Sequence, residues 1–116
     1  MNGGMMDDSP VLALTREGAR AVAMHPGLKG SDWRVLFYVM GQLSGSNVVE
    51  PFSITEASEE LGLSRPTVSA SLKRLREAGI LYKEHPQRTG GVDYLNENVG
   101  VSAYRVYREE SFPDMG

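Results

Sequence analysis

The chain has 116 residues, 41% of them hydrophobic, and a formal net charge of -3, which fits one domain built around a single core. It contains no cysteine, which excludes disulfides, thiolate zinc sites and cysteine nucleophiles. No apolar run approaches the roughly 18 residues of a membrane span, and Asp7 and Asp8 stand where a signal peptide would be basic. We therefore expect a cytoplasmic protein with no membrane contact.

The first part of the chain predicts an arm, a short apolar segment and a helix. Residues 1–10 include two glycines, two acids and a proline without periodicity, which predicts a disordered arm. The apolar residues 11–14 are expected to form either a short edge strand or a docking segment. Thr15 is then expected to cap a helix that ends before Pro26.

Residues 31–45 predict the central core helix. Ser31 is the expected N-cap, and Asp32 lies where the positive end of the helix favours an acid. A buried strand is the competing interpretation, but the length and the capped ends favour a helix. Because the segment is apolar nearly all round, we expect it to be buried on two sides or shared with a second copy of the chain. The positions expected to face the core are Trp33, Leu36, Phe37, Met40 and Leu43.

A helix-turn-helix is the best-marked pattern in the chain, over residues 53–79. Ser53 and Glu56 form a capping box, in which each side chain satisfies a backbone amide at the start of a helix. Gly62 is expected to end that helix in the left-handed conformation, which only glycine adopts without a steric cost. Ser64 is expected to cap the second helix.

The second helix of this pair has an apolar stripe and a polar outward face. Val68, Leu72 and Leu75 fall at i, i+4 and i+7, which directs them toward the core. Small polar groups come first on the other face and cations follow, an order that suits a helix entering the major groove by its N-terminal half. We expect bases to be contacted by Arg65, Thr67, Ser69 and Ala70 and phosphates by Lys73, Arg74 and Arg76, with Ser64 and Pro66 beside them.

Three short segments predict the strands of one small antiparallel sheet. They cover residues 47–52, 80–85 and 102–107. The glycine-containing stretch 86–100 between the last two is long enough for an extended hairpin tip, the outline of a wing. The wing residues expected to contact DNA are Gln87, Arg88 and Thr89. The alternative for this stretch is a plain solvent loop.

The charges are segregated along the chain. Residues 64–88 carry a net +4, while all other residues sum to -7. A local basic patch is the electrostatic footprint of nucleic-acid binding, and an acidic body behind it discourages nonspecific adhesion. The fold expected is mainly α with a small antiparallel β-sheet, a winged helix-turn-helix over residues 11–110, followed by a flexible tail over residues 111–116.

The residue pattern resembles a known family. SITEASEELGLSRPTVSASLKRLREAGILYKE, followed by a wing and SAYRVY, resembles winged helix-turn-helix DNA-binding proteins of bacteria, including MarR-like transcription regulators. The leading VLALTREGARAV and DWRVLFYVMGQL are similar to plasmid replication proteins of the RepL type. The resemblance implies binding to double-stranded DNA, for transcriptional control or at a plasmid or phage-type replication origin. Host replication or transcription machinery is a further partner that this implies, and an origin-binding role would require recruitment of the replication machinery. Two features depart from the family pattern: Ala70 replaces a polar reader, and the wing is longer and more acidic.

Three functional classes are compared on these patterns. The leading function is sequence-specific binding of double-stranded DNA by a homodimer. The alternative is a winged-helix protein-interaction module that does not bind DNA, which the acidic balance and Ala70 favour. An enzyme is not expected, because neither His25 nor His85 has an acid and a nucleophile at a recognisable spacing. No catalytic, cofactor-binding or metal-binding residue is therefore expected.

Overall fold

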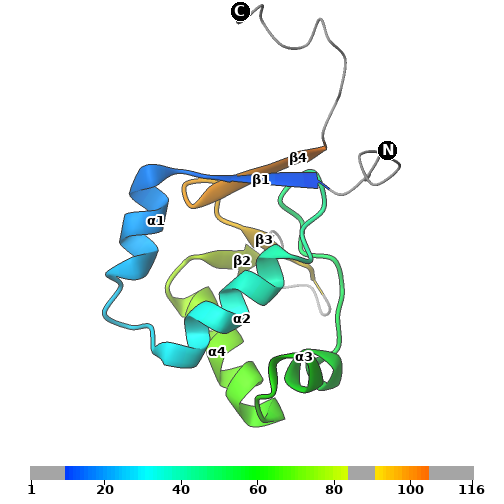
Figure 1. The fold of residues 1–116 in the computed structure, drawn as a ribbon. Helices are drawn as coiled ribbons and strands as arrows, with labels where there is room; N and C mark the ends of the chain where they lie inside the picture. The colour runs from blue at the N-terminus through cyan, green and yellow to red at the C-terminus, as the bar shows by residue number, and fades with distance from the viewer. Residues whose placement is uncertain (1–9, 84–90, 105–116) are drawn as a thin grey trace, which may run out of the picture.

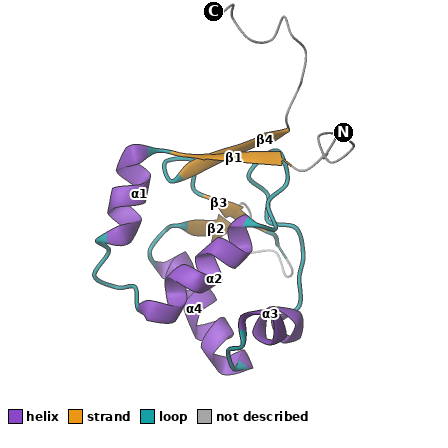
Figure 2. Ribbon diagram, in the orientation of Figure 1, coloured by secondary structure: helices purple, strands orange, loops and turns teal. Residues whose placement is uncertain are grey.

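The computed structural model describes residues 10–83 and 91–104. Residues 1–9 of the arm predicted over residues 1–10, and the tail predicted over residues 111–116, lie outside the described residues. Figures 1 and 2 show the β1 and β4 strands over one end of the helices and the β2 and β3 strands beside α4. The elements in chain order are β1 (Pro10–Leu14), α1 (Arg16–Ala23), α2 (Gly30–Met40), α3 (Ile54–Leu61), α4 (Arg65–Glu77), β2 (Leu81–Lys83), β3 (Asp93–Leu95) and β4 (Gly100–Tyr104).

The fold class predicted from the sequence is confirmed. Four helices and short antiparallel strands form a winged helix fold. The apolar residues before α1 form the strand β1, which begins at Pro10. Thr15 caps α1 as predicted, because its Oγ1 accepts the amide of Gly18 at 2.8 Å. No helix in the described part of the chain is long and apolar enough to cross a bilayer.

The helices α3 and α4 form the helix-turn-helix at the predicted residues. Ser53 Oγ accepts the amide of Glu56 at 2.9 Å, and the Glu56 carboxylate accepts the amide of Ser53 in return. Gly62 ends α3 with a φ of 68°, in the left-handed region. Ser64 Oγ then accepts the amide of Thr67 at 3.2 Å and caps α4. Both caps and the turn glycine are confirmed.

The central helix α2 packs against both α3 and α4. It begins at Gly30 after Lys29, so the prediction of Ser31 as N-cap is wrong. The Asp32 carboxylate reaches back and accepts the Lys29 amide at 2.7 Å, which satisfies an amide at the helix start without a serine. The buried hydrophobic residues of α2 are Val35, Leu36, Val39 and Met40.

Phe37 is not a core residue, which contradicts the prediction. It is 62% exposed, because it lies at the edge of the buried face of α2 and none of the described elements covers it. Trp33 is half-buried, and its Nε1 donates to the carbonyl of Val22 at 3.2 Å. The predictions for Leu36, Met40 and Leu43 are confirmed.

The strands form two separate pairs, so the prediction of one three-stranded sheet is wrong. β1 pairs with β4, and β2 pairs with β3 to form the wing hairpin, both antiparallel. The predicted strand over residues 47–52 reduces to isolated bridges at Val48 and Val49. The prediction of a hairpin tip over residues 86–100 is wrong at its end, because β3 lies within that range and returns the chain along β2.

Asn47 has a backbone conformation that does not fit the start of the predicted strand. Its φ is 64°, and a residue in the left-handed region interrupts an extended strand. Its Nδ2 donates to the carbonyls of Leu95 and Gly100, both at 2.9 Å, and its Oδ1 accepts the Ser102 amide at 2.7 Å. This buried side chain therefore joins β3 of the wing to β4 of the other strand pair.

Candidate nucleic-acid interface

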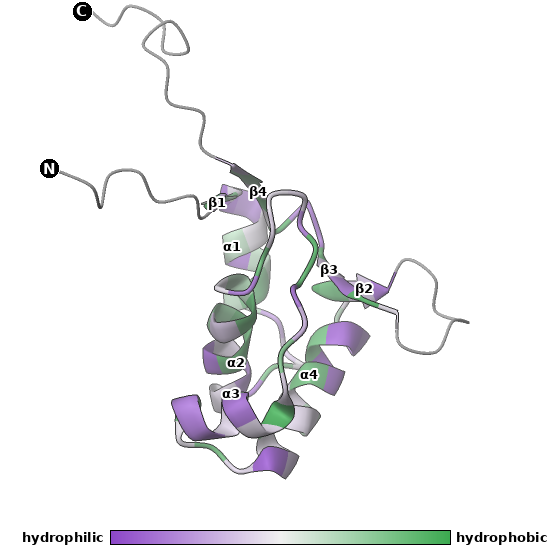
Figure 3. Cartoon of the chain, turned by 90° about the vertical axis from the view of Figure 1, so that its right-hand side faces the viewer, coloured by the Kyte–Doolittle hydropathy of each residue, from purple (hydrophilic) through white to green (hydrophobic). Residues whose placement is uncertain are grey.

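The helix α4 is buried along one side and open to solvent along the other. Val68 and Leu75 are fully buried and Leu72 nearly so, which confirms the predicted apolar stripe. Both ends of α4 are purple in Figure 3, the colour that marks hydrophilic residues. Of the predicted DNA contacts at α4, Ser64, Arg65, Pro66, Ser69, Lys73 and Arg76 are exposed, and Thr67, Ala70 and Arg74 are half-buried.

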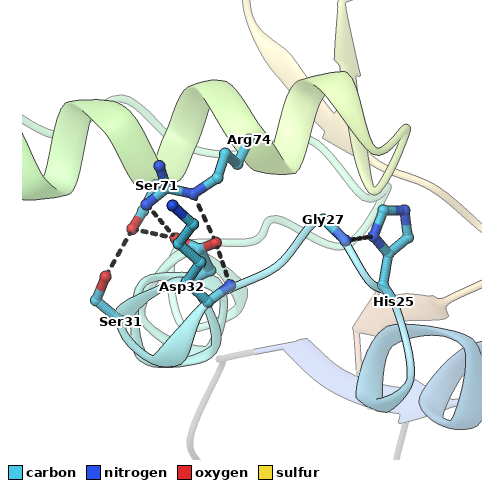
Figure 4. Close-up of polar contacts among 7 residues, drawn as sticks. His25, Gly27, Ser31, Asp32, Ser71 and Arg74 are labelled. Atoms are coloured by element: carbon cyan, nitrogen blue, oxygen red, sulfur yellow. Dashed lines mark hydrogen bonds and ion pairs between the residues drawn. The ribbon is translucent and has the colours of Figure 1, made fainter.

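One flank of α4 is tied to α2 through a buried carboxylate. The Asp32 side chain is fully buried and accepts Arg74 Nε at 2.8 Å and Arg74 Nη2 at 2.9 Å. Ser71 Oγ, one turn before Arg74, donates to the same carboxylate at 2.5 Å, and it also lies 3.2 Å from Ser31 Oγ. Figure 4 shows these side chains between the two helices. The guanidinium of Arg74 therefore has a protein partner, which the sequence pattern did not suggest.

The hydrogen bonds around Asp32 outweigh the effect of its burial. Burial raises the pKa of the Asp32 carboxyl, because a charge is unfavourable away from water. The hydrogen bonds from Arg74, Ser71 and the Lys29 amide, together with the charge of Arg74, lower it further than burial raises it. The pKa of Asp32 therefore lies below its ordinary value, so the carboxylate is charged at neutral pH.

The other flank of α4 is tied to the wing. Arg76 Nε donates to Asp93 Oδ1 at 2.9 Å, and Arg76 Nη2 donates to Asp93 Oδ2 at 2.8 Å. Asp93 lies on β3, within the stretch expected to be a loop tip, so no local pattern pairs it with α4. The side chains of Arg76 and Asp93 are 39% and 15% exposed, which makes this pair more open to water than the pair at Asp32.

Two of the predicted cations have no such partner in the part of the chain that the structure describes. Among residues 10–83 and 91–104, Arg65 and Lys73 form no ion pair. Arg65 opens α4 and Lys73 lies two turns later, and both are exposed. The Thr67 hydroxyl shares a hydrogen bond of 2.7 Å with Ser64 Oγ, so part of its hydrogen-bonding capacity is used at the N-cap of α4.

The described part of the wing lies beside α4. Tyr82 on β2 stacks on Tyr94 on β3 with ring centroids 5.6 Å apart, and Lys83 Nζ donates to the carbonyl of Gly91 at 2.9 Å. Both contacts hold the two strands of the hairpin together. The predicted wing contacts Gln87, Arg88 and Thr89 lie outside the described residues.

Two hollows lie away from the outward face of α4. A cavity of about 370 Å³ lies between α1 and the end of α4, with Glu17, His25, Gly79 and Glu97 in its lining. An apolar groove of about 330 Å³ lies over α1 and α2, lined among others by Leu14, Trp33 and Phe37. Within the described ranges, no group of three or more acids and histidines could hold a metal ion.

Comparison with known proteins found one related family. A family model described as the MarR family matches residues 27–90, more than half of the chain. The matched range includes α2, the helix-turn-helix and β2. No curated protein and no solved structure matched the chain.

Proposed function

The chain belongs to the MarR family, and we propose that it binds double-stranded DNA at specific sequences as a transcriptional regulator. The observation that carries this proposal is the outward face of α4, which combines exposed small residues with two exposed cations that are free of ion pairs in the described part of the chain. A helix with this arrangement fits the major groove, because small side chains permit close approach and cations meet the phosphates at its rims.

The N-terminal half of α4 is the proposed reading surface. We assign the base contacts to Arg65, Thr67, Ser69 and Ala70, of which Arg65 and Ser69 are exposed and Thr67 and Ala70 half-buried. A serine or threonine hydroxyl accepts and donates, so it can pair with more than one base, whereas arginine at a guanine is more selective. Lys73 lies one turn beyond the small residues and is the proposed phosphate contact, which positions the helix without reading sequence.

The wing is proposed as a second contact to the DNA backbone. The Arg76 and Asp93 pair holds β3 beside α4, so the hairpin and the recognition helix face the same side. The proposed contacts at its tip remain Gln87, Arg88 and Thr89. A wing in this place would contact the backbone or an adjacent groove beside the helix in the major groove.

A homodimer is proposed as the binding form. Phe37, which is 62% exposed, and Leu14, which is 43% exposed, both line the apolar groove over α1 and α2. Exposed apolar surface that gathers around a groove is typical of a protein interface. A two-fold pair would present two recognition helices to a near-palindrome, with half-sites about 34 Å apart.

Selection from random double-stranded DNA at two salt concentrations tests this function. We expect a motif to be enriched at both concentrations, and a symmetric motif would support the dimer. The position of the motif in the source DNA separates a promoter operator from a replication origin, since both would use the same surface. If nothing is retained at low salt, the proposal is wrong and a protein-interaction module replaces it.

A further inference from the structure

Two arginines of α4, Arg74 and Arg76, are held by carboxylates in similar geometry but in different surroundings. Arg74 is paired with Asp32 and Arg76 with Asp93, each through Nε and Nη2 at 2.8 to 2.9 Å. The Asp32 side chain is 0% exposed, whereas that of Asp93 is 15% exposed. The difference in burial decides what each arginine is able to do when DNA approaches.

Asp32 is a carboxylate whose two oxygens are both fully used. Oδ1 accepts Ser71 Oγ and Arg74 Nη2, and Oδ2 accepts Arg74 Nε and the Lys29 amide. If Arg74 turned toward a phosphate, the buried Asp32 carboxylate would lose two of its four hydrogen bonds. It would also lose its only ion-pair partner in the described structure. Such an uncompensated buried charge is strongly unfavourable. Arg74 therefore gains little by leaving Asp32.

The pair of Arg76 and Asp93 has no such restraint. Both side chains reach solvent, so water replaces the arginine at Asp93 when the pair opens. Exposed ion pairs contribute little net free energy and are screened by salt. A DNA phosphate can therefore replace Asp93 as the partner of Arg76 with only a small loss of free energy.

We propose that Asp32 is a positioning residue for DNA binding, which fixes α4 on α2 and withholds Arg74 from the phosphate backbone, whereas Arg76 exchanges Asp93 for phosphate. This inference rests on the proposed function. Its consequence is that the phosphate contacts of α4 come from Lys73 and Arg76. Withholding one cation removes a contact that is independent of sequence, and so favours discrimination between specific and nonspecific sites.

The salt dependence of binding to a random-sequence duplex tests the inference, with the two arginines as matched variants. Each phosphate contact changes the slope of log K against log salt by about 0.9. We expect Arg76→Gln to lower the slope by about that amount and Arg74→Gln to leave it unchanged. Asp32→Asn should free Arg74 and raise the slope by about 0.9, and Asp32→Asn with Arg74→Gln should return it to the wild-type value.

A second measurement on the wild-type protein keeps the test independent of how these variants fold. The Nε–H resonances of Arg74 and Arg76 report whether each guanidinium changes partner. On addition of duplex DNA, the Arg76 resonance should shift and the Arg74 resonance should stay in place.

Two results would overturn the inference alone, with wild-type binding intact. One is an equal loss of slope in Arg74→Gln and Arg76→Gln, and the other is a shift of the Arg74 Nε–H resonance on binding. A wild-type protein that fails to bind any duplex at low salt would overturn the proposed function, and this inference with it.

Discussion

Arg76 and Asp93 form a bidentate ion pair that joins the recognition helix α4 to strand β3 of the wing. The two residues are 17 positions apart, and strand β2 lies between them in the chain. The pair therefore connects the two parts of the molecule that are proposed to contact DNA.

Asp93→Asn tests how this pair affects stability and affinity. Because exposed pairs contribute roughly 0 to 1 kcal/mol, the free energy of unfolding should fall by no more than about 1 kcal/mol. The same change leaves the charge of Arg76 unneutralised, so affinity for any duplex should rise, most at low salt. Chemical denaturation and fluorescence anisotropy measure the two effects. A stability loss well above about 1 kcal/mol would show that the pair is structural and does not open readily to a phosphate.

The buried pair at Asp32 predicts an acid-sensitive part of the stability. The pKa of Asp32 is lowered in the folded state, so its contribution is fully present above the ordinary pKa of about 3.9 and is lost as pH falls through the lowered value. The groups that face this carboxylate are Arg74 and Ser71 from α4 and the amide of Lys29, the residue before α2.

Denaturation of the wild type and of Asp32→Asn across pH provides the measurement. The difference in unfolding free energy should be constant between about pH 6 and 8, and should shrink progressively below about pH 5. The asparagine variant does not titrate at this position and serves as the matched control. A difference that grows on acidification would contradict the sign of the pKa shift.

Asn47→Ala should be among the more destabilising single changes. It removes the side-chain bonds to Leu95, Gly100 and Ser102, and leaves buried backbone groups without those partners. We expect a loss of about 2 to 4 kcal/mol from the unpaired groups together with the left-handed backbone. Asn47→Gly relieves the backbone cost and should recover about 1 kcal/mol of it. Equal stabilities of the alanine and glycine variants would show that the φ of 64° carries no cost.

Phe37→Asp tests the proposed dimer surface. Phe37 is 62% exposed, so the change should leave the fold intact while placing a charge at the apolar groove. We expect sedimentation to show a dimer for the wild type and a monomer for the variant. Val92→Asp is the control, because Val92 is also exposed, at 40%, but does not line the groove. A wild type that sediments as a monomer with and without DNA would exclude the dimer.

Local patterns were sufficient to predict the helix-turn-helix. Ser53, Glu56, Gly62 and Ser64 each act on residues within one turn of themselves, so their roles follow from spacing alone. The apolar stripe at Val68 is likewise a property of one helix. These features required no knowledge of which elements meet in space.

Local sequence patterns could not predict which helices and strands contact each other. Asp32 and Arg74 are 42 positions apart, and nothing in either segment marks the other as its partner. Strand β3 has only three residues, too few for an alternating pattern to stand out, so the strand pairing was predicted incorrectly. The prediction that Phe37 faces the core was wrong for a similar reason. The sequence of a helix that is apolar nearly all round does not indicate which face its neighbours leave exposed.

The most direct test of DNA binding through α4 compares the wild type with a variant that carries both Arg65→Gln and Lys73→Gln. Both residues are exposed at α4 and neither has an ion-pair partner in the described ranges, so the fold should be unaffected. Binding to duplex DNA is measured by anisotropy across salt concentrations. Because Lys73 is the proposed phosphate contact and Arg65 a proposed base contact, the slope of log K against log salt should fall by about 0.9 in the variant, and the preference for the selected motif over random sequence should weaken. An unchanged slope, or no binding by the wild type at low salt, would contradict the assignment of α4 as the DNA-binding surface.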